Sequence, residues 1–279
     1  SVIVDGSTVV KLVGSWGTAD RAAGLLATLA GTKIAPEFGG ALHWDLPGRG
    51  EATVAIATEF LDGAEDGWTW AIDDVLAWSA AADAHDPAWP QAVGELAARL
   101  HAALAGAAEP VVVSAAELSA AAGEVLARAE AAIVGTDTAT RVAARRAGLR
   151  RAAAAGSRDV TLPAFDAHDD LHVGQLLRRP GDDPAAAASY RVIDFDGDPQ
   201  TATGLGARPV PAVRDIAHLL TSIDLVASAV QRRLGGADPR ITSWAERART
   251  QAFAAYRSTL DRLDSDLMGD DWNAISALV

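Results

Sequence analysis

Two short stretches in the second half of the chain limit its possible folds more than any other feature. They are residues 168–177, HDDLHVGQLL, and residues 190–197, YRVIDFDG. The first contains a carboxylate at Asp170 and an amide five residues later at Gln175. The second ends an apolar run with another carboxylate, Asp194, which follows Asp170 by 24 positions. We expect these three polar groups to meet at one point of the folded chain.

A carboxylate, an amide and a second carboxylate in this order are the groups that kinase phosphoryl transfer requires. One carboxylate accepts the proton of the attacking hydroxyl, while an amide and a carboxylate hold Mg2+ against the phosphates of ATP. We therefore predict that Asp170 is the catalytic base and that Gln175 and Asp194 are metal ligands. Leu176 and Leu177 would anchor the loop in the core. The alternative is a polar loop whose acids are helix caps or surface charges.

Together, the two stretches resemble the signature H-G-D-L-H-x-G-N followed by I-D-F-[ED] of the aminoglycoside phosphotransferase-like kinases. Gln175 stands where most of that superfamily has Asn, and Asp169 replaces the usual Gly. Residues 194–199, DFDGDP, resemble the D-F-E-G-E-P of actinobacterial maltokinases and related glucosamine kinases. The resemblance implies an α+β, two-lobed protein-kinase-like fold. Its small N-lobe would be mostly β and its large C-lobe α-helical.

Further segments extend the resemblance over nearly the whole chain. Residues 66–68, DGW, are similar to the D-G-W that follows the hinge in maltokinases, and residues 94–104 resemble a maltokinase helix in which His101 has a structural role. Residues 214–220 resemble a family helix whose aspartate braces the catalytic loop. That resemblance makes Asp215 a supporting residue, as is His168 at the start of the loop.

The N-terminus has the pattern of a small sheet. Residues 2–4 and 8–13 are predicted strands joined by a turn at 5–7. Lys11 lies in the second strand and is one of two lysines among 24 basic residues. In kinases a strand lysine contacts the α- and β-phosphates, so Lys11 is the nucleotide candidate. The alternative is an edge-strand lysine that limits aggregation. A helix over 18–29 offers Asp20 as a partner for Lys11.

Two more strands, 41–46 and 52–58, lead into a predicted hinge at 59–63. In the superfamily, hinge backbone groups hold the adenine, so Glu59 and Leu61 are candidates through their main chains. We expect an N-lobe over residues 1–62 and a C-lobe over 63–279. No glycine-rich loop precedes Lys11, and the chain opens with Ser. Since the family that the chain resembles carries further N-terminal structure, we also expect a cap subdomain and a first strand upstream.

The remainder of the chain is predicted to be helical. Helices are expected over 89–105, as a pair within 114–155 broken near Gly135, and over 239–267. The tryptophans at 68, 70, 78 and 89 are predicted to be core residues more than sugar-stacking residues. Four acidic residues are candidates for the acceptor pocket, although those on the last helix would ordinarily face solvent: Asp196, Glu246, Asp261 and Asp264.

Composition excludes several other classes. The net charge of −13 disfavours nucleic acid as a partner, because phosphate backbones are bound by basic surfaces. The absence of cysteine excludes disulfides and thiolate metal sites. No apolar run is long enough for a membrane span, and a cytoplasmic location is the default expectation.

The expected partners are therefore ATP, Mg2+ and a sugar. Three acceptors fit the resemblance: the 6-hydroxyl of glucosamine, the anomeric hydroxyl of maltose, or an aminoglycoside. We favour glucosamine because the C-terminal third is acidic and because the sequence departs from maltokinases at Asp169, Asp196 and over 238–272. A non-enzymatic, pseudokinase-like binding module is the remaining alternative. The retained residues Lys11, Asp170, Gln175 and Asp194 oppose it.

Overall fold

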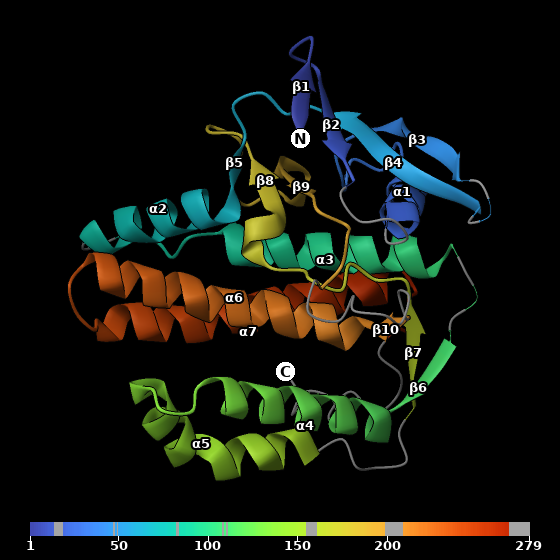
Figure 1. The fold of residues 1–279 in the computed structure, drawn as a ribbon. Coiled ribbons are helices and arrows are strands. Elements are labelled where there is room, and N and C mark those ends of the chain that lie inside the picture. Colours follow the sequence, from blue (N-terminus) through green and yellow to red (C-terminus); the bar gives the residue numbers. More distant parts are fainter. Residues whose placement is uncertain are drawn as a thin grey trace.

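A computed structural model describes residues 1–13, 19–46, 48, 50–81, 84–107, 109, 111–154, 161–198 and 209–267. The fold is mixed α/β (Figure 1). A four-stranded sheet with one helix lies at the N-terminal end, and a layer of long helices lies beside it. A separate helical hairpin is on the far side of that layer.

The N-terminal sheet is antiparallel with strand order β1-β2-β4-β3. Its strands are β1 (Val2–Val4), β2 (Thr8–Leu12), β3 (Phe38–Leu46) and β4 (Gly50–Glu59). The predicted hairpin is confirmed. Its turn has positive φ at Asp5 (50°) and Gly6 (62°), which is the geometry that suits the twist of paired strands.

Helix α1 (Ala19–Thr28) packs against this sheet through a buried apolar stripe that includes Leu25, Leu26 and, just beyond its end, Leu29. The predicted helix is thus confirmed, although residue 18, its predicted first residue, lies outside the described residues. Lys11 pairs with Ile56 in the register of β2 and β4. Because Ile56 is buried, Lys11 lies on the inward face of the sheet.

Four helices form the main layer: α2 (Gly67–Ala80), α3 (Trp89–Ala105), α6 (Ala212–Arg233) and α7 (Pro239–Arg262). Trp70, Trp78 and Trp89 are buried among them, as predicted. The expectation that the last helix reaches residue 267 is wrong, because α7 ends at Arg262. Asp264 has a φ of 50°, which a right-handed helix cannot accommodate, yet Leu267 returns to the core and so continues the apolar pattern.

Three-stranded sheets complete the fold. One consists of β5 (Glu65–Asp66), β8 (Leu176–Arg178) and β9 (Tyr190–Val192). The short helix η1 (Val173–Gln175) precedes β8, and η2 (Ala187–Ser189) precedes β9. The other sheet, β10 (Val210–Pro211), β7 (Thr161–Phe165) and β6 (Val111–Ser114), was not predicted.

The helical hairpin comprises α4 (Ala115–Ala132) and α5 (Asp137–Ala154), with the predicted break at Gly135, whose φ is 81°. Ser114 caps α4 in a reciprocal arrangement with Glu117. Within the described part of the chain, we find no helix with the length and apolar character needed to cross a bilayer.

The close contact between α3 and α7 gives a stability prediction. A Cβ added at Gly94 would lie 2.0 Å from the carbonyl oxygen of Ala252. Gly94→Ala therefore forces the two helices apart, and we expect it to lower the free energy of unfolding by about 1–3 kcal/mol. Gly123→Ala in α4 is the matched control, because its Cβ meets nothing within 4 Å. Denaturant unfolding should show that control to be neutral or up to about 1 kcal/mol more stable. Equal stability of the two variants would contradict the close packing at Gly94.

Candidate active site

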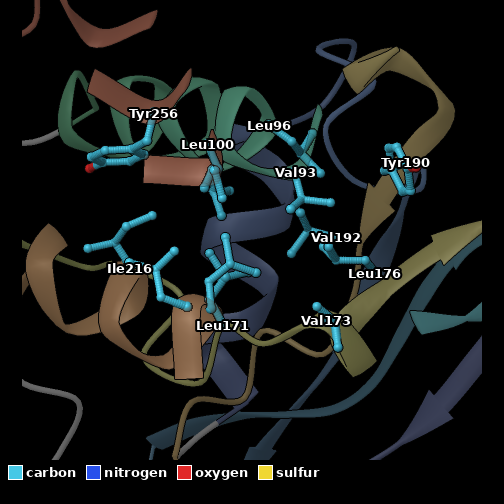
Figure 2. Packing of buried hydrophobic residues seen from close by; sticks show 14 of the residues in the cluster. Val93, Leu96, Leu100, Leu171, Val173, Leu176, Tyr190, Val192, Ile216 and Tyr256 are labelled. Atoms are coloured by element: carbon cyan, nitrogen blue, oxygen red, sulfur yellow. The ribbon is translucent and has the colours of Figure 1, made fainter. Parts of the chain in front are cut away.

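The segment from Asp170 to Leu176 alternates between buried and accessible side chains. Leu171, Val173 and Leu176 are at most 1% exposed and belong to the buried cluster that also contains Leu96 and Leu100 of α3 (Figure 2). The side chains of Asp170 and His172, on either side of Leu171 in the sequence, are 29% and 27% exposed. Because the apolar residues fix the backbone, the carboxylate of Asp170 is held at the accessible surface of a rigid loop.

The departure from the family signature at Asp169 is explained by its backbone. Asp169 has a φ of 69°, a left-handed conformation that glycine adopts freely and that aspartate tolerates better than most residues. Its carboxylate forms an ion pair of 2.8 Å with Arg214 Nε, and Arg214 also contacts Asp198 Oδ2 at 3.0 Å. Burial raises the pKa of Asp169 in spite of this cation. The loop thus keeps the conformation that a glycine would provide.

Asp215, at the start of α6, is fully buried and accepts hydrogen bonds from the loop that begins at His168 and carries Asp170, the predicted catalytic loop. Its carboxylate receives the backbone N–H groups of His168 (2.9 Å) and Asp169 (2.8 Å). It also receives His101 Nε2 at 3.2 Å, and His101 Nδ1 in turn accepts from the hydroxyl of Tyr256 at 2.8 Å. Burial opposes ionisation, but the hydrogen bond from His101 brings the pKa of Asp215 below its ordinary value. His101 is therefore structural, as predicted.

His168 connects the catalytic loop to the segment that carries Asp194. Its Nε2–H donates to the carbonyl oxygen of Ile193 at 2.9 Å, and its Nδ1 accepts from the backbone N–H of Asp170 at 3.3 Å. The ring also packs on Phe195 with centroids 5.0 Å apart. Burial lowers the pKa of His168, which favours the neutral ring that these two bonds require.

A charged cluster consists of Lys11, Asp194 and Asp196. Lys11 Nζ lies 2.7 Å from Asp194 Oδ1 and 2.5 Å from Asp196 Oδ2. Burial would raise the pKa of Asp194, but the hydrogen bond and charge of Lys11 bring it below its ordinary value. Conversely, burial lowers the pKa of Lys11 but its two carboxylate partners raise it overall. These two shifts favour the charged forms of Lys11 and Asp194.

Gln175 and Asp194 are suited to hold a divalent cation. Gln175 Nε2 lies 3.4 Å from Asp194 Oδ2, so a half-turn of the amide would present two oxygens side by side. A carboxylate and an amide oxygen suit Mg2+, which takes its remaining ligands from water and phosphates. Among the described residues, no group of three or more His, Cys, Asp or Glu side chains could form a metal site by itself. The donor set therefore fits a metal shared with a nucleotide.

The D-G-W segment holds the catalytic loop from the side of α2. Asp66 caps that helix by accepting the N–H of Trp68 at 2.9 Å. A Cβ at Gly67 would lie 1.7 Å from the carbonyl oxygen of Val173, so only glycine allows this approach. Trp68 is partly buried, unlike its three neighbouring tryptophans, and its ring lies 5.6 Å from that of His172. Nε2 of His172 is 3.9 Å from Asp170 Oδ2.

The predicted hinge residues have engaged backbones. The N–H of Glu59 donates to the carbonyl of Glu37 at 2.8 Å, and the carbonyl of Leu61 accepts from Ala64 at 3.1 Å. Neither bond uses the carbonyl of Glu59 or the N–H of Leu61.

The four acceptor candidates do not lie together. Asp196 is beside Lys11, whereas Glu246, Asp261 and Asp264 are exposed. Tyr256 contacts the network of Asp215 through His101. Glu246 is about 15 Å from Tyr256 along the axis of α7 and Asp261 about 7.5 Å, given 1.5 Å per residue. Among the hydrogen bonds and ion pairs of the described residues, none joins these three acids to Asp170.

Sequence reasoning missed Arg21. This residue of α1 donates from one guanidinium to the carbonyl oxygens of Phe195 (2.8 Å) and Ala167. The side chain of Asp20, the predicted partner of Lys11, lies outside the described residues. Arg21 is the one basic residue in the α1 sequence ADRAAGLLAT, which was a signal, but its partners are 174 and 146 positions away.

No family model matches the chain, but curated proteins and solved structures do. It is 35% identical over 229 residues to a glucosamine kinase of Streptacidiphilus jiangxiensis, covering 78% of this chain and 49% of that protein. It is 34% identical over 230 residues to a glucosamine kinase of Mycolicibacterium smegmatis, covering 80% and 55%. The chain thus spans about half the length of these curated relatives.

Solved structures agree with the sequences. A glucosamine kinase in complex with glucosamine, ADP and inorganic phosphate superposes with a TM-score of 0.82 at 31% identity, covering 99% of this chain and 70% of that one. A second crystal form of a glucosamine kinase gives a TM-score of 0.81 at 32% identity, with 100% and 67% covered. Identity and coverage at this level, with the loop geometry described above, show that the chain belongs to the glucosamine kinase family.

Proposed function

We propose that the protein is an ATP- and Mg2+-dependent sugar kinase that phosphorylates the 6-hydroxyl of glucosamine. The observation that carries this proposal is the position of Asp170 relative to the charged cluster. His168 ties the Asp170 loop directly to the segment of Asp194, where Lys11 and Gln175 converge. The structure of a family member that holds glucosamine, ADP and phosphate supports it further.

In this mechanism Asp170 accepts the proton of the sugar hydroxyl as its oxygen attacks the γ-phosphorus, and ADP departs with the electrons of the broken P–O bond. Gln175 and Asp194 would hold Mg2+, which supplies charge neutralisation at the phosphates. Lys11 would contact the α- and β-phosphates, because its ammonium already lies in the cluster with Asp194. The hydrogen bonds of Asp215 and His168 keep the backbone of the loop fixed.

The adenine is proposed to lie at Glu59–Leu61. The carbonyl of Glu59 would accept from the exocyclic amine, and the N–H of Leu61 would donate to the ring. The two backbone hydrogen bonds described above for Glu59 and Leu61 do not use these groups. With the N-terminal sheet as one lobe (residues 1–62) and the helical part as the other (63–279), the nucleotide would bind between them.

The amino group of the acceptor gives a specificity prediction. Asp196 is paired with Lys11, which also binds the proposed metal ligand Asp194. The acids at and beyond the end of α7, Asp261 and Asp264, are therefore the first candidates to read the ammonium, ahead of Glu246. These acids are exposed in the unliganded chain, so the bound sugar must exclude water from the pair; loss of one partner of such a desolvated pair costs about 2–5 kcal/mol. We expect kcat/KM for glucose to be below that for glucosamine by well over tenfold.

The test compares kcat/KM for glucosamine, glucose, N-acetylglucosamine, maltose and an aminoglycoside, assayed side by side on the whole protein. N-acetylglucosamine should be refused, because acetylation removes the charge and adds bulk. Asp261→Asn and Asp264→Asn should lower the ratio of kcat/KM for glucosamine to kcat/KM for glucose. Glu246→Gln should leave that ratio unchanged. Maltose as the best substrate would support a maltokinase instead, and equal rates with glucose and glucosamine would show that no carboxylate reads the amine.

A further inference from the structure

The N-terminal sheet and its helix reach the catalytic residues through two cations with different partners. Lys11 from β2 binds the carboxylates of Asp194 and Asp196. Arg21 from α1 binds the carbonyl oxygen of the residue between them, Phe195, and also that of Ala167. One side chain therefore joins α1 to both segments that carry the reacting groups.

The two carbonyls occupy informative positions. Ala167 is fully buried and directly precedes the loop of His168, Asp169 and Asp170. Phe195 is 2% exposed and follows Asp194, whose φ of 65° turns the backbone there. A planar guanidinium with donors in a fixed fork can bind two such acceptors at once, whereas an ammonium is a single point charge. The distance between the two segments is consequently set partly by the width of one arginine side chain.

The space around this contact is full. A Cβ added at Gly197, where φ is 81°, would lie 3.3 Å from Arg21 Nη1 and 3.6 Å from Asp169 Oδ2. Glycine at that position thus leaves room for the guanidinium between the two segments. The positive charge of Arg21 also affects residues of the loop that follows Ala167. Burial lowers the pKa of His168, and Arg21 adds to this effect; burial raises the pKa of Asp169, and Arg21 opposes that rise.

We propose that Arg21 is a positioning residue that couples α1 to catalysis by fixing the separation of Asp170 from Asp194. In protein kinases this coupling is made by a helix glutamate that pairs with the strand lysine. Here Lys11 binds Asp194 and Asp196 directly. Helix α1 contributes Arg21, which binds backbone carbonyl oxygens. The inference rests on the proposed kinase function, and it concerns how the proposed site is held in its reactive geometry.

The experiment measures kcat, KM for glucosamine and KM for ATP in Arg21→Ala and Arg21→Lys, on the whole protein with Mg2+. We expect kcat to fall about tenfold to 100-fold in both variants, because misplacement of a catalytic group by about 1 Å has that effect. KM for glucosamine should change little. Arg99→Ala is the matched control, since Arg99 makes an exposed pair with Glu95 on α3 and should keep the wild-type kcat.

Two further readouts separate positioning from a general loss of stability. Millimolar guanidinium chloride should partly restore kcat in Arg21→Ala but not in Arg21→Lys, with potassium chloride as the ionic-strength control. Hydrogen exchange should increase over residues 166–170 and 193–197 in Arg21→Ala, while the buried part of α3 keeps its protection. Neither readout would follow if Arg21 only contributed to overall stability.

Failure of the inference about Arg21 can be distinguished from failure of the proposed kinase function. A wild-type protein that phosphorylates no sugar would overturn the kinase assignment, but the exchange comparison would still test the contact itself. An active wild type with wild-type kcat in Arg21→Ala would overturn the inference alone. So would a lowered kcat that guanidinium does not restore, accompanied by loss of protection throughout the molecule.

Discussion

Asp170→Asn should lower turnover by at least about 100-fold, since general-base contributions run from about 100-fold to 10,000-fold. The amide has the shape of the carboxylate but cannot accept the hydroxyl proton. Because the loop is fixed by Leu171, Val173 and the hydrogen bonds to Asp215, the substitution should leave the backbone in place. We therefore expect KM for ATP and the unfolding midpoint to remain near the wild-type values.

Steady-state kinetics with the best acceptor will check this expectation. Asp166→Asn is the matched control, because Asp166 is an exposed acid four residues earlier in the same segment. That variant should have wild-type turnover. If Asp170→Asn also retains wild-type turnover, Asp170 is not the base, and the proposed mechanism fails at its central step.

Asp215→Ala should be the most destabilising of these substitutions, with a loss of about 3–5 kcal/mol in the free energy of unfolding. Removal of this carboxylate leaves three buried donors without their acceptor: the N–H groups of His168 and Asp169, and the ring of His101. Each unsatisfied buried donor costs about 1–3 kcal/mol. The loss should appear as both a lower unfolding midpoint and reduced turnover, because the same donors fix the catalytic loop.

The control and the pH dependence sharpen this test. Asp224 lies on α6, as Asp215 does, but its carboxylate makes an exposed pair with Arg249 of α7, so Asp224→Ala should cost no more than about 1 kcal/mol. The pKa of Asp215 in the folded protein is below its ordinary 3.8, so its stabilisation is complete above that pH. It is lost as the pH falls through the lowered pKa. The difference between wild type and Asp215→Ala should therefore shrink below about pH 4, and a difference that grows with acid would contradict the assignment.

Local patterns were sufficient for much of the fold. The hairpin of β1 and β2 and the helices α1, α3, α4 and α5 follow from periodicity and turn residues. The end of α7 could not be read in this way. Leu267 matches the apolar stripe of the helix but reaches the core from outside it, after Asp264 has turned the backbone. Periodicity reports which residues are buried, and it does not report the path by which they arrive there.

For the site, the sequence by itself determined which chemical groups are available. Asp170, Gln175 and Asp194 could be named because a short loop and a strand end fix their spacing locally. The tertiary structure alone decided what holds them: Arg21 reaches carbonyls 146 and 174 positions away, and Trp68 packs on His172. It also paired Lys11 with Asp194 and Asp196. Such contacts depend on how whole elements pack, because a side chain binds whatever the fold brings within about 3 Å of it.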